Sequence, residues 1–244
     1  TSIFGSLILI DNLTLGAATQ LLTFEGRGSF TINSYALTFE KSITLNAPTG
    51  TLTLAANFTM GVTRTLTITN GIFDASASNY VISAGLVSIG TSGTITLRGG
   101  THLLTGTGSV WTGTGTITAS TGTLKITDTS ISAITFAGGT KTYNNIYFSR
   151  GASTGTNTIT GTNTFADFKD DGSAAHTIAF TAGTTTTVTT FTVNGTAGNL
   201  ISINSVDTAT HALAKAGGGT ITCDYLSIQH SVASPTLTWL ATNS

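Results

Sequence analysis

Short runs in which Thr or Ser alternates with Leu, Ile, Val or Phe recur along the chain, and Gly, Asn, Asp or Ser bounds each run. This period of two predicts short, half-buried β-strands with no helix between them. In the first part of the chain the predicted strands are Phe30–Asn33, Ala36–Phe39, Ser42–Leu45, Thr51–Leu54, Thr65–Thr69, Tyr80–Ser83, Leu86–Ile89, Thr94–Leu97, Thr101–Thr105, Ser109–Thr112, Thr116–Thr118, Thr123–Thr127 and Ala133–Phe136.

Two all-β architectures accommodate many short strands at this spacing. A β-sandwich needs tight hairpins, but the Asn-Gly signal of such turns occurs only at Asn70-Gly71 and Asn194-Gly195. A right-handed parallel β-helix, or β-solenoid, uses roughly 20 to 25 residues per coil and stacks Thr, Ser, Asn and aliphatic side chains. We therefore predict an irregular β-solenoid of about ten coils, with the β-sandwich as the alternative.

The composition of the sequence changes near Thr140. Beyond this residue, aromatic residues are more frequent and the predicted strands are longer. We assign residues 1–139 to a Thr/Gly-rich β-solenoid and residues 140–244 to a continuing solenoid or a C-terminal β segment. The alternation in Thr220–Gln229 slips once, as at a β-bulge, and makes Cys223 a small core residue. The longer strands are Lys141–Phe148, His176–Thr181, Thr186–Val193, Leu200–Ser205 and Thr220–Gln229.

The composition narrows the functional classes. Only 8% of residues are charged and the formal net charge is -1, with Lys and Arg spread singly, so we expect no nucleic-acid partner. Apolar runs such as Leu7–Ile10 are far shorter than the ~20 residues of a membrane helix, so we expect no membrane insertion. Because the chain begins at Thr1 without Met, we expect a fragment of a longer protein.

Several segments of the second half carry a family resemblance: Lys125–Ser130, Thr135–Ile146, Asn163–Asp171, Phe180–Thr185, Asn194–Ile201 and Cys223–Ile228. Over roughly residues 101–244 the chain resembles a family of β-helical proteins from environmental bacteriophages and uncultivated bacteria, similar to phage virion or tail-fibre components. The resemblance implies a virion location, and the family has no assigned catalytic residues to carry over to this chain. It also implies a short tail beyond the Trp-containing strand at Leu237–Leu240, so the stop at Ser244 points to a truncated chain.

The acids Asp167, Asp170 and Asp171 are the only carboxylate cluster in the sequence. Such acids can act as acid and base in polysaccharide cleavage or bind Ca²⁺. Since Asp170-Asp171-Gly172 is a strong turn signal, we interpret the segment as a solvated loop.

Other candidate residues have structural interpretations. His102, His176, His211 and His230 lack a short metal-ligand spacing, so we predict strand or loop positions and neither metal nor cofactor. Glycines within Thr105–Gly115 lack the Lys and helix of a phosphate loop and are interpreted as solenoid corners. The aromatic side chains that we expect to offer a glycan-stacking surface are Trp111, Tyr143 and Tyr147.

Paired threonines suggest an ice-binding face, which requires each Thr-X-Thr pair to lie at the same place in every coil. We rank this function last, because the pairs are separated by unequal intervals and β propensity alone favours Thr in strands. The pairs are Thr51 with Thr53, Thr65 with Thr67 and Thr69, Thr94 with Thr96, Thr116 with Thr118, and Thr158 with Thr160.

The sequence therefore predicts a non-enzymatic structural component of a bacteriophage particle, a tail fibre, spike or capsid-attached β-helix used for attachment or stabilisation. We expect a homotrimer that contacts other virion proteins and, through weak polar contacts, a host surface glycan. A polysaccharide-degrading tailspike using Asp167 with Asp170 or Asp171, a bacterial surface adhesin and an ice-binding protein are the alternatives.

Overall fold

The structure is a computed structural model that describes residues 1–10 and 21–243. Ser244, at which the resemblance predicts truncation, lies outside these described residues. The chain divides into two compact units, residues 1–106 with 110–124 and residues 107–109 with 125–244. Each unit is a parallel β-solenoid, and the two together contain about ten turns. The predicted solenoid is confirmed.

The described elements are almost all strands. From the N-terminus they are β1 (Ser2–Ile3), β2 (Leu7–Ile8), β3 (Leu22–Phe24), β4 (Ser29–Asn33), β5 (Thr38–Phe39), β6 (Ile43–Leu54), β7 (Phe58–Met60), β8 (Thr65–Asp74), β9 (Ile82–Ala84), β10 (Leu86–Thr96), β11 (Thr101–Leu104), β12 (Gly108–Gly113), β13 (Thr116–Thr118) and β14 (Thr123–Ile126). They continue with β15 (Ile134–Ala137), β16 (Thr142–Phe148), β17 (Asn157–Thr160), β18 (Thr164–Asp170), β19 (His176–Phe180), β20 (Thr185–Val193), β21 (Ile201–Ser205), β22 (His211–Lys215), β23 (Ile221–Asp224), β24 (Leu226–Ile228), β25 (Ser231–Ser234), the 3₁₀ turn η1 (Thr236–Thr238) and β26 (Trp239–Thr242).

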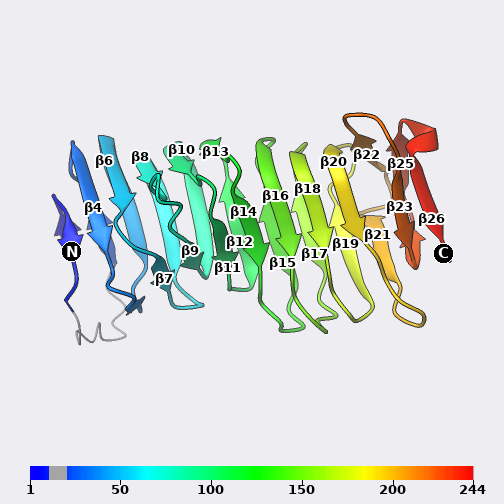
Figure 1. The fold of residues 1–244 in the computed structure, drawn as a ribbon, viewed down its shortest axis with the longest axis horizontal. Coiled ribbons are helices and arrows are strands. Elements are labelled where there is room, and N and C mark those ends of the chain that lie inside the picture. The colour runs from blue at the N-terminus through cyan, green and yellow to red at the C-terminus, as the bar shows by residue number, and fades with distance from the viewer. Residues whose placement is uncertain (11–20, 244) are drawn as a thin grey trace. The chain divides into compact units, whose positions relative to one another are not determined.

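In the first unit, the long strands β6, β8 and β10 pair in parallel and lie side by side (Figure 1). Each is interrupted by a register shift near its middle, so one strand contributes to two faces of the coil. Strands β5, β7, β9 and β11 form a third row of strands. Apolar side chains point inward and stack in rows, as in Leu52, Phe73 and Ile95.

Glycines let the chain turn between the first two faces. Gly71 has φ +89°, and a Cβ there would lie 2.4 Å from the carbonyl oxygen of Ala47 in the preceding coil. At Gly115 a Cβ would lie 2.2 Å from the carbonyl oxygen of Gly90. Because a side chain at either place would force successive coils apart, the predicted role of glycine at corners is confirmed at Gly115.

The second unit repeats the arrangement with longer aromatic rows. Strands β16, β18, β20 and β22 pair in parallel, as do β15, β17, β19, β21 and β24 (Figure 1). Inside, the ring of Phe168 contacts those of Phe148, Phe165, Phe180 and Phe191, with centroids 5.1 to 6.0 Å apart. Offset and edge contacts of this kind stabilise the core beyond simple burial.

Most predicted strands are present, with differences that have physical causes. Ser42–Leu45 and Thr51–Leu54 merge into β6, because both halves pair with β8 around the corner. The predicted slip in Thr220–Gln229 is confirmed at Tyr225, whose φ of +53° separates β23 from β24. The solvated loop predicted for this segment is wrong for Asp167 and Asp170, which lie in β18 beside the buried Phe168, whereas Asp171 follows the strand and is exposed.

Candidate functional site

The first unit carries a registered array of hydroxyl side chains on the face formed by β4, β13 and the C-terminal halves of β6, β8 and β10. Parallel pairing aligns Ser29 with Thr51, and Thr94 with Thr116, in one row. A second row, two residues further along each strand, aligns in the same way. The array, named here the Thr-X-Thr array, consists of Ser29, Thr31, Thr51, Thr53, Ile72, Asp74, Thr94, Thr96, Thr116 and Thr118.

The inward residue between each pair explains why the hydroxyls point outward. Phe30, Leu52, Phe73 and Ile95 are buried, with at most 4% of their surface exposed. Because side chains alternate across a strand, burying the central residue turns both flanking residues to solvent. The array therefore follows from core packing in these four coils, and in β13 the half-buried Ile117 takes the same place between Thr116 and Thr118.

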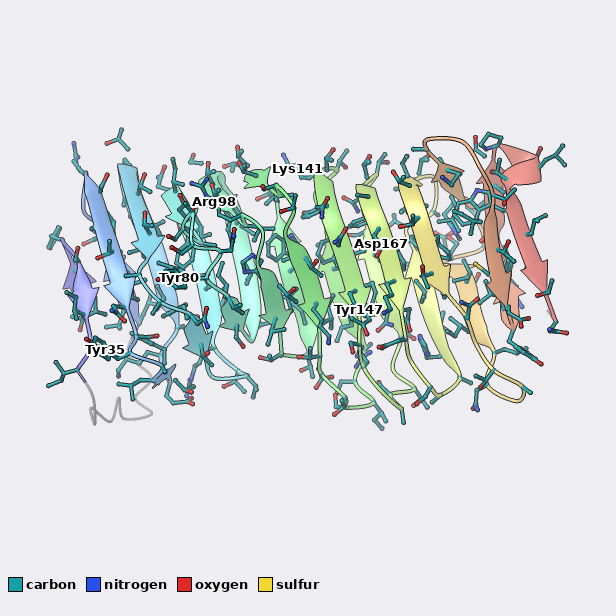
Figure 2. The ribbon with its side chains drawn as sticks, in the orientation of Figure 1. Tyr35, Tyr80, Arg98, Lys141, Tyr147 and Asp167 are labelled. Carbon is teal, nitrogen blue, oxygen red and sulfur yellow. The ribbon has the colours of Figure 1, made fainter. Side chains whose placement is uncertain are left out.

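One coil interrupts the array. Ile72 and Asp74 occupy the two positions there, and the Asp74 carboxylate accepts hydrogen bonds of 2.8 Å from Arg98 Nε and 2.6 Å from Arg98 Nη2. Arg98, labelled in Figure 2, follows β10 by two residues. This ion pair lowers the pKa of the Asp74 carboxyl and neutralises its charge at the surface.

Sequence reasoning missed this array because it compared all Thr pairs along the chain. The first array position of each coil on this face is residue 29, 51, 72, 94 or 116. The interval between successive positions is nearly constant once the coil with Ile72 is included. Thr65 and Thr67 lie in the other half of β8, and Thr158 with Thr160 belong to the second unit. The expectation of unregistered pairs is corrected for the first unit.

A second candidate surface surrounds Tyr147 on the outer face of β16 and β18, and is named the Tyr147 patch. The ammonium groups of Lys125 and Lys169 lie 4.8 and 4.4 Å from the centre of the Tyr147 ring. The Tyr147 hydroxyl donates a hydrogen bond to the Asp171 carboxylate. Figure 2 shows Tyr147 on the same face as Asp167. The patch thus combines an aromatic ring, two cations and a carboxylate.

The other two predicted glycan contacts are in the core. Trp111 is 1% exposed and Tyr143 2% exposed, and the Tyr143 hydroxyl donates a 2.7 Å hydrogen bond to the carbonyl of Gly138. Their rings present no face to a ligand outside the molecule, so the expected surface position is corrected for both. Tyr147 alone of the three is half-exposed.

The three acids predicted as a cluster diverge in the structure. Asp170 points inward and is 4% exposed, whereas Asp171 lies on the outer side beside Tyr147. Asp167 is also on the outer side and bonds the Thr190 hydroxyl, but four residues of extended chain place it about 13 Å along the strand from Asp171. The geometry does not present two of these carboxylates to one substrate at the separation of roughly 5 to 9.5 Å that glycoside hydrolysis needs.

Asp170 belongs to a buried polar network. Its carboxylate accepts hydrogen bonds from Asn157 Nδ2 at 3.2 Å and from the backbone amide of Gly172 at 2.8 Å, and it lies 3.1 Å from His176 Nε2. The other ring nitrogen of His176 lies 2.8 Å from the carbonyl oxygen of Ala174. Since both neighbours are acceptors, the ring satisfies both contacts when it carries two protons.

Arg150, 3% exposed, joins this network to two neighbouring loops. Its guanidinium donates to the Asp128 carboxylate at 3.0 Å, to Asn157 Oδ1 at 2.8 Å and to the carbonyls of Asp128, Ser130, Ser132 and Gly155. A buried guanidinium with this many partners is a structural element, because every bond closes a loop and none faces a cleft.

The remaining titratable candidates are structural. His102 and His211 are each 1% exposed, and burial lowers the pKa of His102 and lowers that of His211 to about 4. Burial raises the pKa of the Cys223 thiol to about 11, so the thiol stays protonated and unreactive at neutral pH. The predicted strand positions of His102, His176 and His211, and the core position of Cys223, are confirmed.

Comparisons with known proteins add no relative: a scan of family models, a search of curated proteins and a search of solved structures each found no match. Within residues 1–10 and 21–243, no three His, Cys, Asp or Glu side chains are grouped so that they could hold a metal ion. Over the same residues, no helix is long and apolar enough to cross a membrane.

Proposed function

We propose that this chain is a non-catalytic structural and attachment component of a bacteriophage particle, with the role of a fibre, spike or capsid-attached β-helix. The observation that carries the structural part is the unbroken parallel pairing of coils within each unit, from β4 to β13 in the first and from β15 to β24 in the second. The phage assignment itself comes from the sequence resemblance.

Attachment is supported by the surface chemistry of the second unit. The Tyr147 patch offers a ring edge together with cationic and anionic groups, which suits an acidic or hydroxyl-rich glycan bound through many weak contacts. Large apolar side chains remain exposed in the same unit, with Ile131 at 78% and Leu237 at 86%. Assembly into a homotrimer or docking on other virion proteins would bury such groups.

The polysaccharide-cleaving alternative is less well supported, because Asp170 points into the core, where its carboxylate accepts a hydrogen bond from Asn157 and contacts the His176 ring. A bacterial surface adhesin would share every feature above and differs in where the protein is located.

Binding to bacterial surface glycans tests the attachment function. The labelled chain should bind a glycan array or whole cells, and Tyr147→Ala should abolish that binding while the matched surface variant Thr187→Ala on β20 retains it. Release of reducing sugar ends from a bound polysaccharide would overturn the non-catalytic assignment. Immunogold labelling of particles from a culture that carries this coding sequence tests the location, and label confined to cell envelopes would favour the adhesin.

A further inference from the structure

We infer that the Thr-X-Thr array of the first unit is an ice-binding face. This inference is independent of the proposed attachment function, which uses the second unit. It rests on the registered rows of hydroxyls, on their spacing and on the absence of protein partners for most of them.

The spacing of the array is compatible with a hydrogen-bonded water lattice. Successive coils of a parallel sheet lie about 4.8 Å apart, and residues i and i+2 about 6.7 Å. Two water molecules bonded tetrahedrally to the same third molecule lie about 4.5 Å apart when each oxygen–oxygen distance is about 2.75 Å. Waters held by consecutive hydroxyls of one row therefore have nearly the separation that they have in ice.

The hydroxyls are available and are held in place. Within the described part of the chain, no protein group bonds the hydroxyls of Thr51, Thr53, Thr94 or Thr96. Thr31 makes one contact, a 3.3 Å bond to Ser6. Because β-branching restricts χ1, each Thr loses little side-chain freedom on binding, and its methyl group fits between ordered waters.

The residue types of the array favour ice over a crystalline polysaccharide as the ligand. Polysaccharide surfaces are usually held by aromatic rings, and none of the ten array positions is aromatic. The one charged group of the array, Asp74, is paired with Arg98. An almost uncharged hydroxyl and methyl surface suits water, which the array can order without displacing strongly bound ions.

Thermal hysteresis, ice-crystal shaping and adsorption of the labelled chain to an ice surface test the inference. The unmodified chain should separate the freezing and melting temperatures and coat ice. Thr96→Tyr, which places a bulky ring between Asp74 and Thr118 within the array, should abolish both effects. Thr164→Tyr is the matched control, since Thr164 lies in a single hydroxyl row with Thr142 and Thr187, and should leave both unchanged.

A gain-of-function variant makes the test independent of damage to the fold. Ile72→Thr restores a hydroxyl in the interrupted coil at a 38% exposed position and should widen the hysteresis gap. Circular dichroism and thermal unfolding establish that each variant is folded. Absence of hysteresis and of adsorption in the unmodified chain, or equal activity in folded Thr96→Tyr, would overturn the inference, as would Thr96-dependent binding to crystalline chitin or cellulose in place of ice.

Discussion

Arg150 is a buried cation whose six hydrogen bonds tie Asp128, Asn157 and two loops together. Arg150→Met removes the charge and leaves the Asp128 carboxylate and four carbonyl groups without this donor. Breaking a buried ion pair costs about 3–5 kcal/mol. We expect a loss of this size in the free energy of unfolding, measured by urea denaturation.

Arg98 provides the comparison for Arg150, because it also pairs with an aspartate but its side chain is 40% exposed. Solvent-exposed pairs contribute about 0–1 kcal/mol, so Arg98→Met should shift the urea midpoint only slightly. Equal effects of the two substitutions would contradict a structural role for the Arg150 network.

His211 makes the protein sensitive to acid. Burial lowers its folded pKa to about 4, while an unfolded His titrates near pH 6.5. Between about pH 6.5 and pH 4, His211 is therefore protonated in the unfolded chain but neutral in the folded chain. The free energy of unfolding falls as the pH drops through this range. His211→Phe, beside the Phe180 ring, should reduce this fall, as measured by unfolding midpoints from pH 4 to 7. An unchanged slope would contradict it.

His176 has the opposite dependence. Burial lowers the pKa of His176. The hydrogen bond and charge of Asp170, together with the hydrogen bond to the Ala174 carbonyl, outweigh burial and raise the folded pKa above the ordinary value. Its contribution is complete below about pH 6.5 and is lost as the pH rises through the raised pKa. The stability difference between the unmodified chain and His176→Gln should be largest in acid and shrink at higher pH. A difference that grows with pH would exclude the charged pair.

At the scale of the element, the corners decide whether coils can stack. Gly71→Ala puts a Cβ 2.4 Å from a carbonyl oxygen at a φ of +89°, so β8 must move away from β6. We expect a marked drop in thermal midpoint. Gly28→Ala is the control, because a Cβ there meets no atom within 4 Å and its φ is not in the left-handed region. Similar midpoints for the two variants would show that the corner tolerates a side chain.

The strands differ in how well their alternation reveals burial. In the C-terminal halves of β6 and β10, Thr lies outside and Leu or Ile inside in strict alternation, and the sequence predicts these strands at Thr51–Leu54 and Thr94–Leu97. In β18 the pattern is broken, since Ala166 and Asp167 both lie outside between Phe165 and Phe168. The acidic residues of this segment have a high turn propensity, so the sequence predicted a turn. The core packing of Phe165 and Phe168, which local propensity does not reveal, makes the segment a strand instead.

At the scale of the whole molecule, the low charge governs behaviour in solution. With 9 basic and 10 acidic residues and a pI of about 6.4, the protein has almost no net repulsion near neutral pH. Proteins near zero net charge associate most readily. Light scattering should therefore reach a maximum near pH 6.4 and decline on both sides. A scattering profile independent of pH would indicate association through neutral faces alone.

By itself, the sequence determined the all-β class, the parallel solenoid and most strand positions. These depend on local alternation and on the lack of helix-forming surfaces, and both are visible in short windows. It also indicated that Cys223 is a core residue, through the same alternation.

Only the tertiary structure decided which residues share a face. The pairs at Thr51, Thr94 and Thr116 become one array because the corners and loops set each coil's register, and register is a property of contacts between distant segments. The same contacts turned Trp111 and Tyr143 inward. They also enclosed Asp170 with His176, because the energy of a buried charge depends on partners that no local pattern reveals.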